Sequence, residues 1–175
     1  MATADELAAK AAAAQARADR LTAEAERKSE GAHHGYDRFA GGQPLLVGHH
    51  SYRSAVRDRR RADAASDRAL DAYKAAQAAQ REAAYIRARA EAKAEITKLT
   101  NAKSRPWEPA DFRPGDIVTV RVFETSTSTY PVKRVNQKTL TLDGGGGGFD
   151  DPKRTYDRVL SRTRDGITVT DPAAN

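Results

Sequence analysis

The four histidines form two adjacent pairs, His33-His34 and His49-His50, and their side chains titrate closest to neutral pH. Four converging imidazoles would suit zinc or nickel. A first helix that extends to residue 40 would, however, hold the two pairs on the order of 20 Å apart. We therefore expect no metal site and no cofactor. We assign His49 and His50 a structural role, in which they bond backbone carbonyls of their loop and orient Ser51.

A serine beside two histidines raises the question of nucleophilic catalysis. Ser51 with His49 or His50 would supply a nucleophile and a base, but adjacent residues at a helix start rarely point at one another. No aspartate at a suitable spacing orients either imidazole. Ser51 is instead a natural N-cap for the helix that follows it. We predict no catalytic residue and a protein that is not an enzyme.

These histidines belong to an apolar, glycine-bracketed connector, residues 41–51, between two long, alanine-rich, charged runs. Glycines here permit backbone conformations that other residues avoid. We expect Leu45-Leu46-Val47 to fold over the end of the helices as an apolar plug, with an exposed docking patch as the alternative. The residues that we single out as a structural motif are Gly42, Gln43, Pro44, Gly48, His49, His50 and Ser51.

The densest basic cluster follows the connector directly. Its arginines recur near one face of the predicted helix, where they suit contacts with phosphate that are independent of sequence. The predicted nucleic-acid-binding residues are Arg53, Arg57, Arg60, Arg61 and Arg68. Asp58 and Asp63 interrupt the run, so a solvated or internally paired face is the alternative. Few aromatic residues accompany these arginines, which disfavours stacking on single strands.

The spacing of alanines predicts two long helices, over residues 3–40 and 52–99, that pack along a coiled-coil seam. Gly31 and Gly35 should weaken the end of the first helix. The connector is short, so we expect an antiparallel hairpin over residues 1–101. Because alanine buries little area, we also expect the hairpin to self-associate into a larger bundle. A single exposed helix held by charge pairs is the alternative.

The composition changes after the helices. Residues 102–109 are interpreted as a linker, and residues 110–170 as a small SH3-like β-barrel, which makes the fold class α+β. A turn is expected over residues 157–160, and the glycines of 144–148 are expected to form a hairpin tip. The five predicted strands cover residues 117–122, 130–135, 139–142, 154–156 and 166–169.

The connector resembles the core of an uncharacterised domain family of actinobacterial genomes, plasmids and phages, whose hallmark is G-Q-P-[IL]-L-V-G-H-H-S. That family continues with an acidic residue and then a third histidine, whereas this chain has Tyr52 and Ala55 at those positions. The segment Arg134 to Leu142 is similar to a tail often attached to such proteins. The resemblance implies a phage or mobile-element context and no established activity.

Charge and composition limit the partners. The formal charge of the chain is +6, and residues 51–107 carry +7 by themselves, from 14 Lys and Arg against 7 Asp and Glu. This favours DNA or RNA as a partner. There is no cysteine, no leader and no apolar run of membrane-spanning length, so we expect a cytoplasmic or virion-associated protein without a membrane.

Two functions follow from these observations. The first is a non-enzymatic phage or mobile-element accessory protein that binds nucleic acid through the basic second helix. The alternative is a structural or adaptor protein that self-associates through the hairpin and binds a protein partner through the barrel.

Overall fold

The computed structural model describes residues 2–37, 39, 47–144 and 151–174. It divides into two compact units: residues 6–88 form the helical unit, and residues 1–5 with 89–175 form the β unit. The expected α+β class is confirmed, since two long helices precede an antiparallel sheet. Among the described residues, no helix is both long and apolar enough to span a membrane. The motif positions Gly42, Gln43 and Pro44, and the plug residues Leu45-Leu46, lie outside the described residues.

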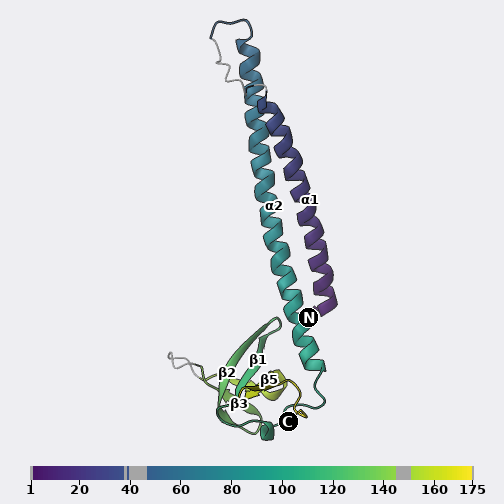
Figure 1. The fold of residues 1–175 in the computed structure, drawn as a ribbon, viewed down its shortest axis with the longest axis vertical. Helices are drawn as coiled ribbons and strands as arrows, with labels where there is room; N and C mark the ends of the chain where they lie inside the picture. Colours follow the sequence, from purple (N-terminus) through teal and green to yellow (C-terminus); the bar gives the residue numbers. More distant parts are fainter. Residues whose placement is uncertain (1, 38, 40–46, 145–150, 175) are drawn as a thin grey trace. The chain divides into compact units, whose positions relative to one another are not determined.

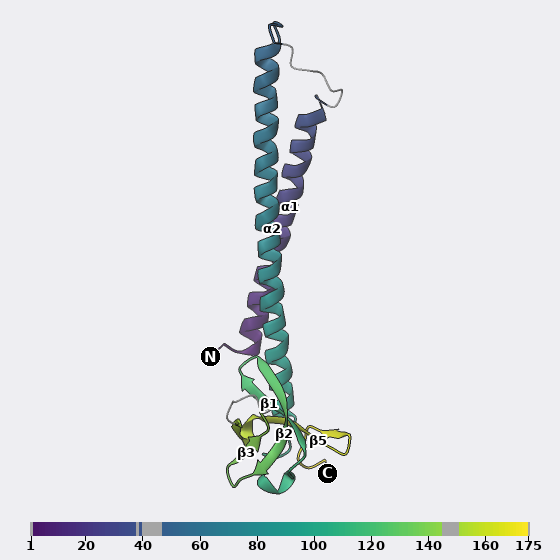
Figure 2. The same ribbon diagram turned by 90° about the vertical axis from the view of Figure 1, so that its left-hand side faces the viewer.

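Two antiparallel helices build the helical unit. Helix α1 covers Ala4–Asp37 and helix α2 covers Tyr52–Asn101, and within this unit they run side by side (Figures 1 and 2). The predicted hairpin is therefore present. Helix α1 ends three residues before the expected residue 40, and α2 ends two residues after the expected residue 99.

Small side chains form the seam of this hairpin. Ala18 is completely buried, and it packs with Ala79 and Ala83. Gly35 lies against the other helix as well, because a Cβ atom built on it would be 3.5 Å from the Cβ of Ala62. Helix α1 thus continues through Gly35, where the missing side chain permits a close approach to α2.

Polar contacts also join the two helices. The Gln80 side chain donates to the Thr22 hydroxyl at 3.0 Å. Nearer the connector, the Tyr36 hydroxyl donates to the Asp63 carboxylate, and this bond is the main reason why the pKa of Tyr36 is raised. The hairpin is therefore held by small-residue packing together with a few specific hydrogen bonds.

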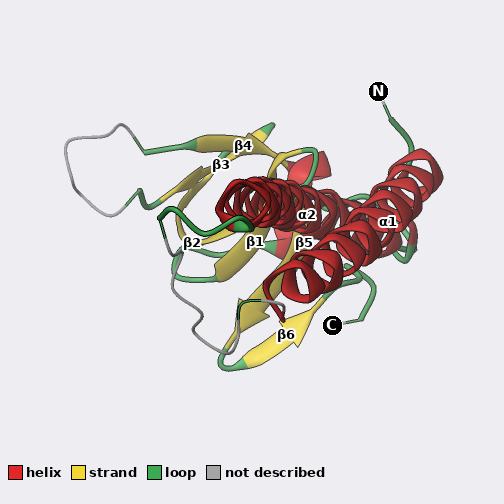
Figure 3. Cartoon of the chain, turned by 90° about the horizontal axis from the view of Figure 1, so that it is seen from above, coloured by secondary structure: helices red, strands yellow, loops and turns green. Residues whose placement is uncertain are grey.

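The β unit contains one six-stranded antiparallel sheet in the order β4-β3-β2-β1-β5-β6 (Figure 3). Register shifts that mark bulges or irregularities interrupt the pairing of β1 with β2, of β1 with β5 and of β2 with β3, and bulges of this kind bend a sheet. The strands are β1 Ile117–Phe123, β2 Ser126–Val135, β3 Thr139–Leu142, β4 Lys153–Thr155, β5 Val159–Arg164 and β6 Ile167–Val169.

The sheet differs from the prediction in its number of strands, and β2 begins at Ser126, four residues before the predicted start. We expected five strands and a turn at residues 157–160, but a 3-10 turn covers Tyr156–Arg158 and a further strand, β5, begins at Val159. The turn prediction is wrong for Val159 and Leu160, which are both buried. The polar pair Asp157-Arg158 indicated a turn correctly, but the turn begins one residue earlier, at Tyr156, and ends at Arg158.

The core of the β unit extends into the segment interpreted as a linker. Trp107 is only 3% exposed, and its ring centroid lies 5.2 Å from that of Phe112, which in turn lies 5.6 Å from Tyr156. These aromatic rings pack on Val118 and Leu140 from the sheet. The chain before β1 therefore contributes directly to the core.

Two buried carboxylates are neutralised by arginines in the same unit. Asp116 accepts bonds from Nε and Nη2 of Arg164, both at 2.8 Å, and Asp111 accepts from both terminal nitrogens of Arg105. Burial is the largest single influence and raises the pKa of each carboxyl, but the arginine hydrogen bonds, a backbone N–H bond and the nearby arginine charges together lower it. The bidentate pair of Arg164 with Asp116 joins the end of β5 to the residue before β1.

Candidate nucleic-acid interface and connector

The five predicted arginines all lie on the first half of α2 and are all exposed. At 3.6 residues per turn they occupy an arc of about 100° and a length of about 22 Å along the helix. Ala62, which is 3% exposed and packs on α1, lies on the far side of α2 from this arc. We call this surface the arginine face; its members are Arg53, Arg57, Arg60, Arg61 and Arg68.

The two acids that interrupt the arginine run do not neutralise it. Asp63 accepts a hydrogen bond from Tyr36 of α1. Asp58 is partly buried and pairs with the exposed Arg61 at the long distance of 3.9 Å, which makes the pair weak. In the part of the chain that the structure describes, the other four members of the arginine face form no ion pair. Four guanidinium groups are thus available to an external anion.

A sixth arginine of this run has a different role. The Arg59 guanidinium lies 5.5 Å from the centroid of the Phe39 ring, just beyond the end of α1. This is a cation–π contact. Arg59 therefore helps to hold the connector end of the hairpin and does not belong to the arginine face.

The described part of the connector makes a compact turn before α2. Gly48 has a φ of 91°, in the region that favours glycine. Nδ1 of His49 lies 2.7 Å from the hydroxyl of Ser51 and accepts the backbone N–H of Ser51 at 3.3 Å. The His50 ring lies 4.2 Å from that of His49. The prediction that a histidine orients Ser51 is confirmed for His49.

The expectation that Ser51 and a histidine do not point at one another is wrong. The cause is the turn before α2, which brings residue 49 back toward residue 51. Since Nδ1 accepts the Ser51 N–H, the same nitrogen accepts the hydroxyl proton, and the remaining ring proton is assigned to Nε2. Helix α2 begins at Tyr52, directly after Ser51. Both interactions are local and exposed, which is typical of the end of a helix.

The other histidine pair lies on α1. His34 contacts the Asp37 carboxylate at 3.2 Å, and His33 faces a groove between the helices. Within the described ranges, no three His, Asp or Glu side chains come close enough together to hold a metal ion. The histidines are therefore found in two different local environments.

A smaller basic surface occurs on the sheet. Cross-strand pairing aligns Arg134 of β2 with Thr141 of β3, and Thr141 with Lys153 of β4. They line a hollow of about 640 Å³ together with Lys133 and Asp151, which pair at 2.7 Å. Because Asp151 pairs with Lys133, Arg134 and Lys153 are the two cations of this hollow that could bind an external anion, compared with four on the arginine face.

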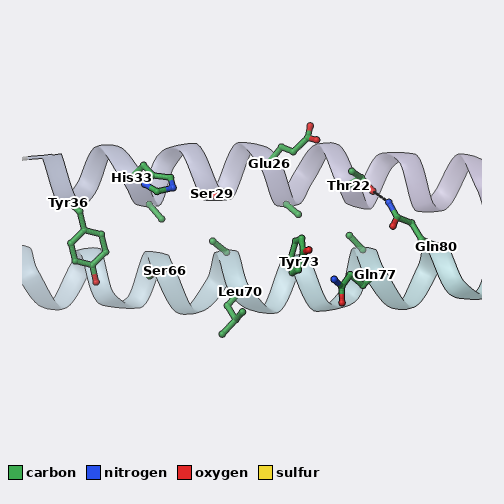
Figure 4. Close-up of a pocket in the computed structure, with 14 residues that line it drawn as sticks. Thr22, Glu26, Ser29, His33, Tyr36, Ser66, Leu70, Tyr73, Gln77 and Gln80 are labelled. Atoms are coloured by element: carbon green, nitrogen blue, oxygen red, sulfur yellow. Dashed lines mark hydrogen bonds between the residues drawn. The ribbon is translucent and has the colours of Figure 1, made fainter.

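One feature of the helical unit was not predicted. A groove of about 550 Å³ runs between α1 and α2 on one side of the hairpin (Figure 4). Leu70 and Tyr73, which are 52% and 56% exposed, line it. In the sequence, Leu70 and Tyr73 belong to a second row on α2 with steps of four and three. This row is less regular in composition than the neighbouring alanine row, which dominates the periodicity.

Comparison with known proteins identifies a family for the helical part. A family model described as "Domain of unknown function (DUF3560)" matches residues 2–104, which is more than half of the 175-residue chain. The searches of curated proteins and of solved structures gave no significant match. The matched range contains the arginine face, the groove and the connector.

Proposed function

The chain belongs to the DUF3560 family, and we propose that this member is a non-enzymatic accessory protein that binds nucleic acid through the arginine face of α2. One observation carries the proposal: four of the five arginines on this face have no acidic partner in the described part of the chain. The connector motif that ends at Ser51 supports a further part of the proposal, a setting in phages or mobile elements of actinobacteria.

The dimensions of the face suit a phosphate backbone. Its length of about 22 Å corresponds to roughly six phosphates of one strand, at about 3.4 Å each. Arginine is suited to this contact because its planar guanidinium donates two parallel hydrogen bonds to one phosphate. The arginines are exposed along one regular helix, so the proposed contact is with the phosphate backbone and not with base edges.

Charge-neutralised variants of the full chain test this proposal. The binding variant is R53Q/R57Q/R60Q, and the matched control is R17Q/R20Q/R27Q, which removes three arginines from α1. Binding to a fluorescent duplex of about 20 base pairs is measured by anisotropy. At about 0.1 M salt each lost phosphate contact lowers affinity about 8-fold, so the binding variant should lose affinity on the order of 500-fold.

The control distinguishes the contribution of the arginine face to affinity from the contribution of the net charge of the chain. Both variants lose the same charge, so an equal and small loss of affinity in both would refute the arginine face. Circular dichroism establishes that both retain the helix content of the parent chain. Absence of binding by the parent chain at low salt would refute the nucleic-acid proposal as a whole.

A further inference from the structure

The groove beside the alanine seam has the pattern of an additional helix-packing surface. On α2 its lining residues recur at steps of four and three, as do those on α1. Two heptad-spaced rows that flank one groove are the arrangement into which another helix packs in a bundle. The α2 row is Ser66, Leu70, Tyr73, Gln77 and Gln80, and the α1 row is Thr22, Glu26, Ser29, His33 and Tyr36.

The α2 row carries no charge although its helix is highly charged. Between residues 66 and 80 the charged side chains Asp67, Arg68, Asp71 and Lys74 all fall outside this row. No lysine or arginine is among the described residues that line the groove. A nucleic acid therefore finds no lysine or arginine there. Glu26 is the one carboxylate among the described lining residues and lies on α1, whereas the α2 row is an uncharged helix surface that suits another uncharged row.

The two largest α2 side chains of the groove are among those that the hairpin itself leaves exposed. In the described helical unit the buried seam consists of alanines apart from Leu7, whereas Leu70 and Tyr73 are more than half exposed. Figure 4 shows Tyr36, Tyr73 and Gln77 along the groove, with the Thr22–Gln80 hydrogen bond at one end. A seam of alanines buries little area, so the hairpin gains stability when these larger side chains are covered.

We propose that this groove is the interface through which two copies of the chain pair to form a four-helix bundle. A two-fold interface must be self-complementary, and an uncharged row meets this requirement because it faces an identical uncharged row. Leu70 and Tyr73 of one copy then pack on the same residues of the other. On α2 the groove row lies on the side away from the arginine face, so both arginine faces of the dimer stay exposed.

Light scattering after size-exclusion chromatography tests the pairing in the absence of nucleic acid. The 19.0 kDa chain should elute at twice its mass. The variant L70E/Y73E should raise the dimer dissociation constant on the order of 100-fold, because each change occurs twice in the interface. The matched control is Y85E, which alters an exposed tyrosine of α2 outside the groove.

A monomeric parent chain at the highest concentration would overturn the proposal, and so would a dimer that persists in L70E/Y73E with unchanged helix content. A second measurement does not depend on the stability of that variant. The chain has no cysteine, so L70C and Y73C can be oxidised to test whether copies cross-link there, with Y85C as control. Cross-linking at the groove positions alone supports the interface, and cross-linking only at Y85C overturns it. Because no nucleic acid is present, this result is independent of the proposed function.

Discussion

The bidentate pair between Arg164 and Asp116 should be a major source of stability in the β unit. Asp116 has a side-chain exposure of 3%, and it retains only the Arg113 backbone N–H, at 2.7 Å, when Arg164 is removed. Breaking a buried pair by removal of one partner costs about 3–5 kcal/mol. Since Arg164 is partly exposed and the N–H bond remains, we expect R164L to lower the free energy of unfolding by about 3 kcal/mol.

The dependence of this effect on pH gives a sharper test. The pKa of Asp116 is lowered in the folded chain, so its stabilisation is present above the unfolded pKa of about 3.9 and is lost as pH falls through the folded pKa. In R164L, loss of the arginine hydrogen bonds and charge should raise the pKa of Asp116 above its value in the parent. The difference in stability between R164L and the parent should therefore shrink as pH falls toward about 4.

Urea unfolding followed by the fluorescence of Trp107 measures both effects. Trp107 is the one tryptophan of the sequence and lies in the core of the β unit, so its emission reports on this unit. The control is R121L, which removes an exposed pair with Asp157 at 4.0 Å and should cost less than about 1 kcal/mol. Equal losses in R164L and R121L, or a pH-independent difference for R164L, would refute this reasoning.

Three further predictions concern the hairpin and are measured by thermal or urea unfolding followed by circular dichroism. Y36F should destabilise the hairpin at pH values below about 10. The effect should disappear as pH rises through the pKa of folded Tyr36, which is raised by its bond to Asp63. An equal effect at all pH values would contradict this. G35A should stabilise it by up to about 1 kcal/mol, since its Cβ meets Ala62 at an ordinary contact distance, whereas G35L should destabilise it; a stable G35L would show that the helices are not in close contact there. A18L should cost about 1–3 kcal/mol because Ala18 is completely buried in the seam, and no loss would indicate that the seam is loose.

The helices follow from local sequence because their alanine rows and the absence of glycine or proline between residues 52 and 101 leave few alternatives. Trp107 shows the limit of this reasoning. It lies between two prolines, which indicates a linker, yet its large apolar surface is needed to close the β core. Composition at a domain boundary does not reveal which side chains return to the core.

The candidate sites were predictable to different degrees. The arginine face depends on helical periodicity alone, so the structure places all five residues as expected on one exposed face. The contact between His49 and Ser51 depends on the turn geometry around Gly48, which the sequence does not specify. The groove was missed because the row of Leu70 and Tyr73 is mostly polar and lies beside a more regular alanine row.

The dependence of nucleic-acid affinity on salt tests the central proposal most directly. The affinity of the full chain for a short duplex is measured across salt concentrations, and its logarithm is plotted against that of the salt concentration. The four arginines of this face that lack an acidic partner predict a slope of about −3.6, which R53Q/R57Q/R60Q should reduce to about −0.9. A parent slope shallower than about −1, or no binding at low salt, would contradict a phosphate-binding arginine face.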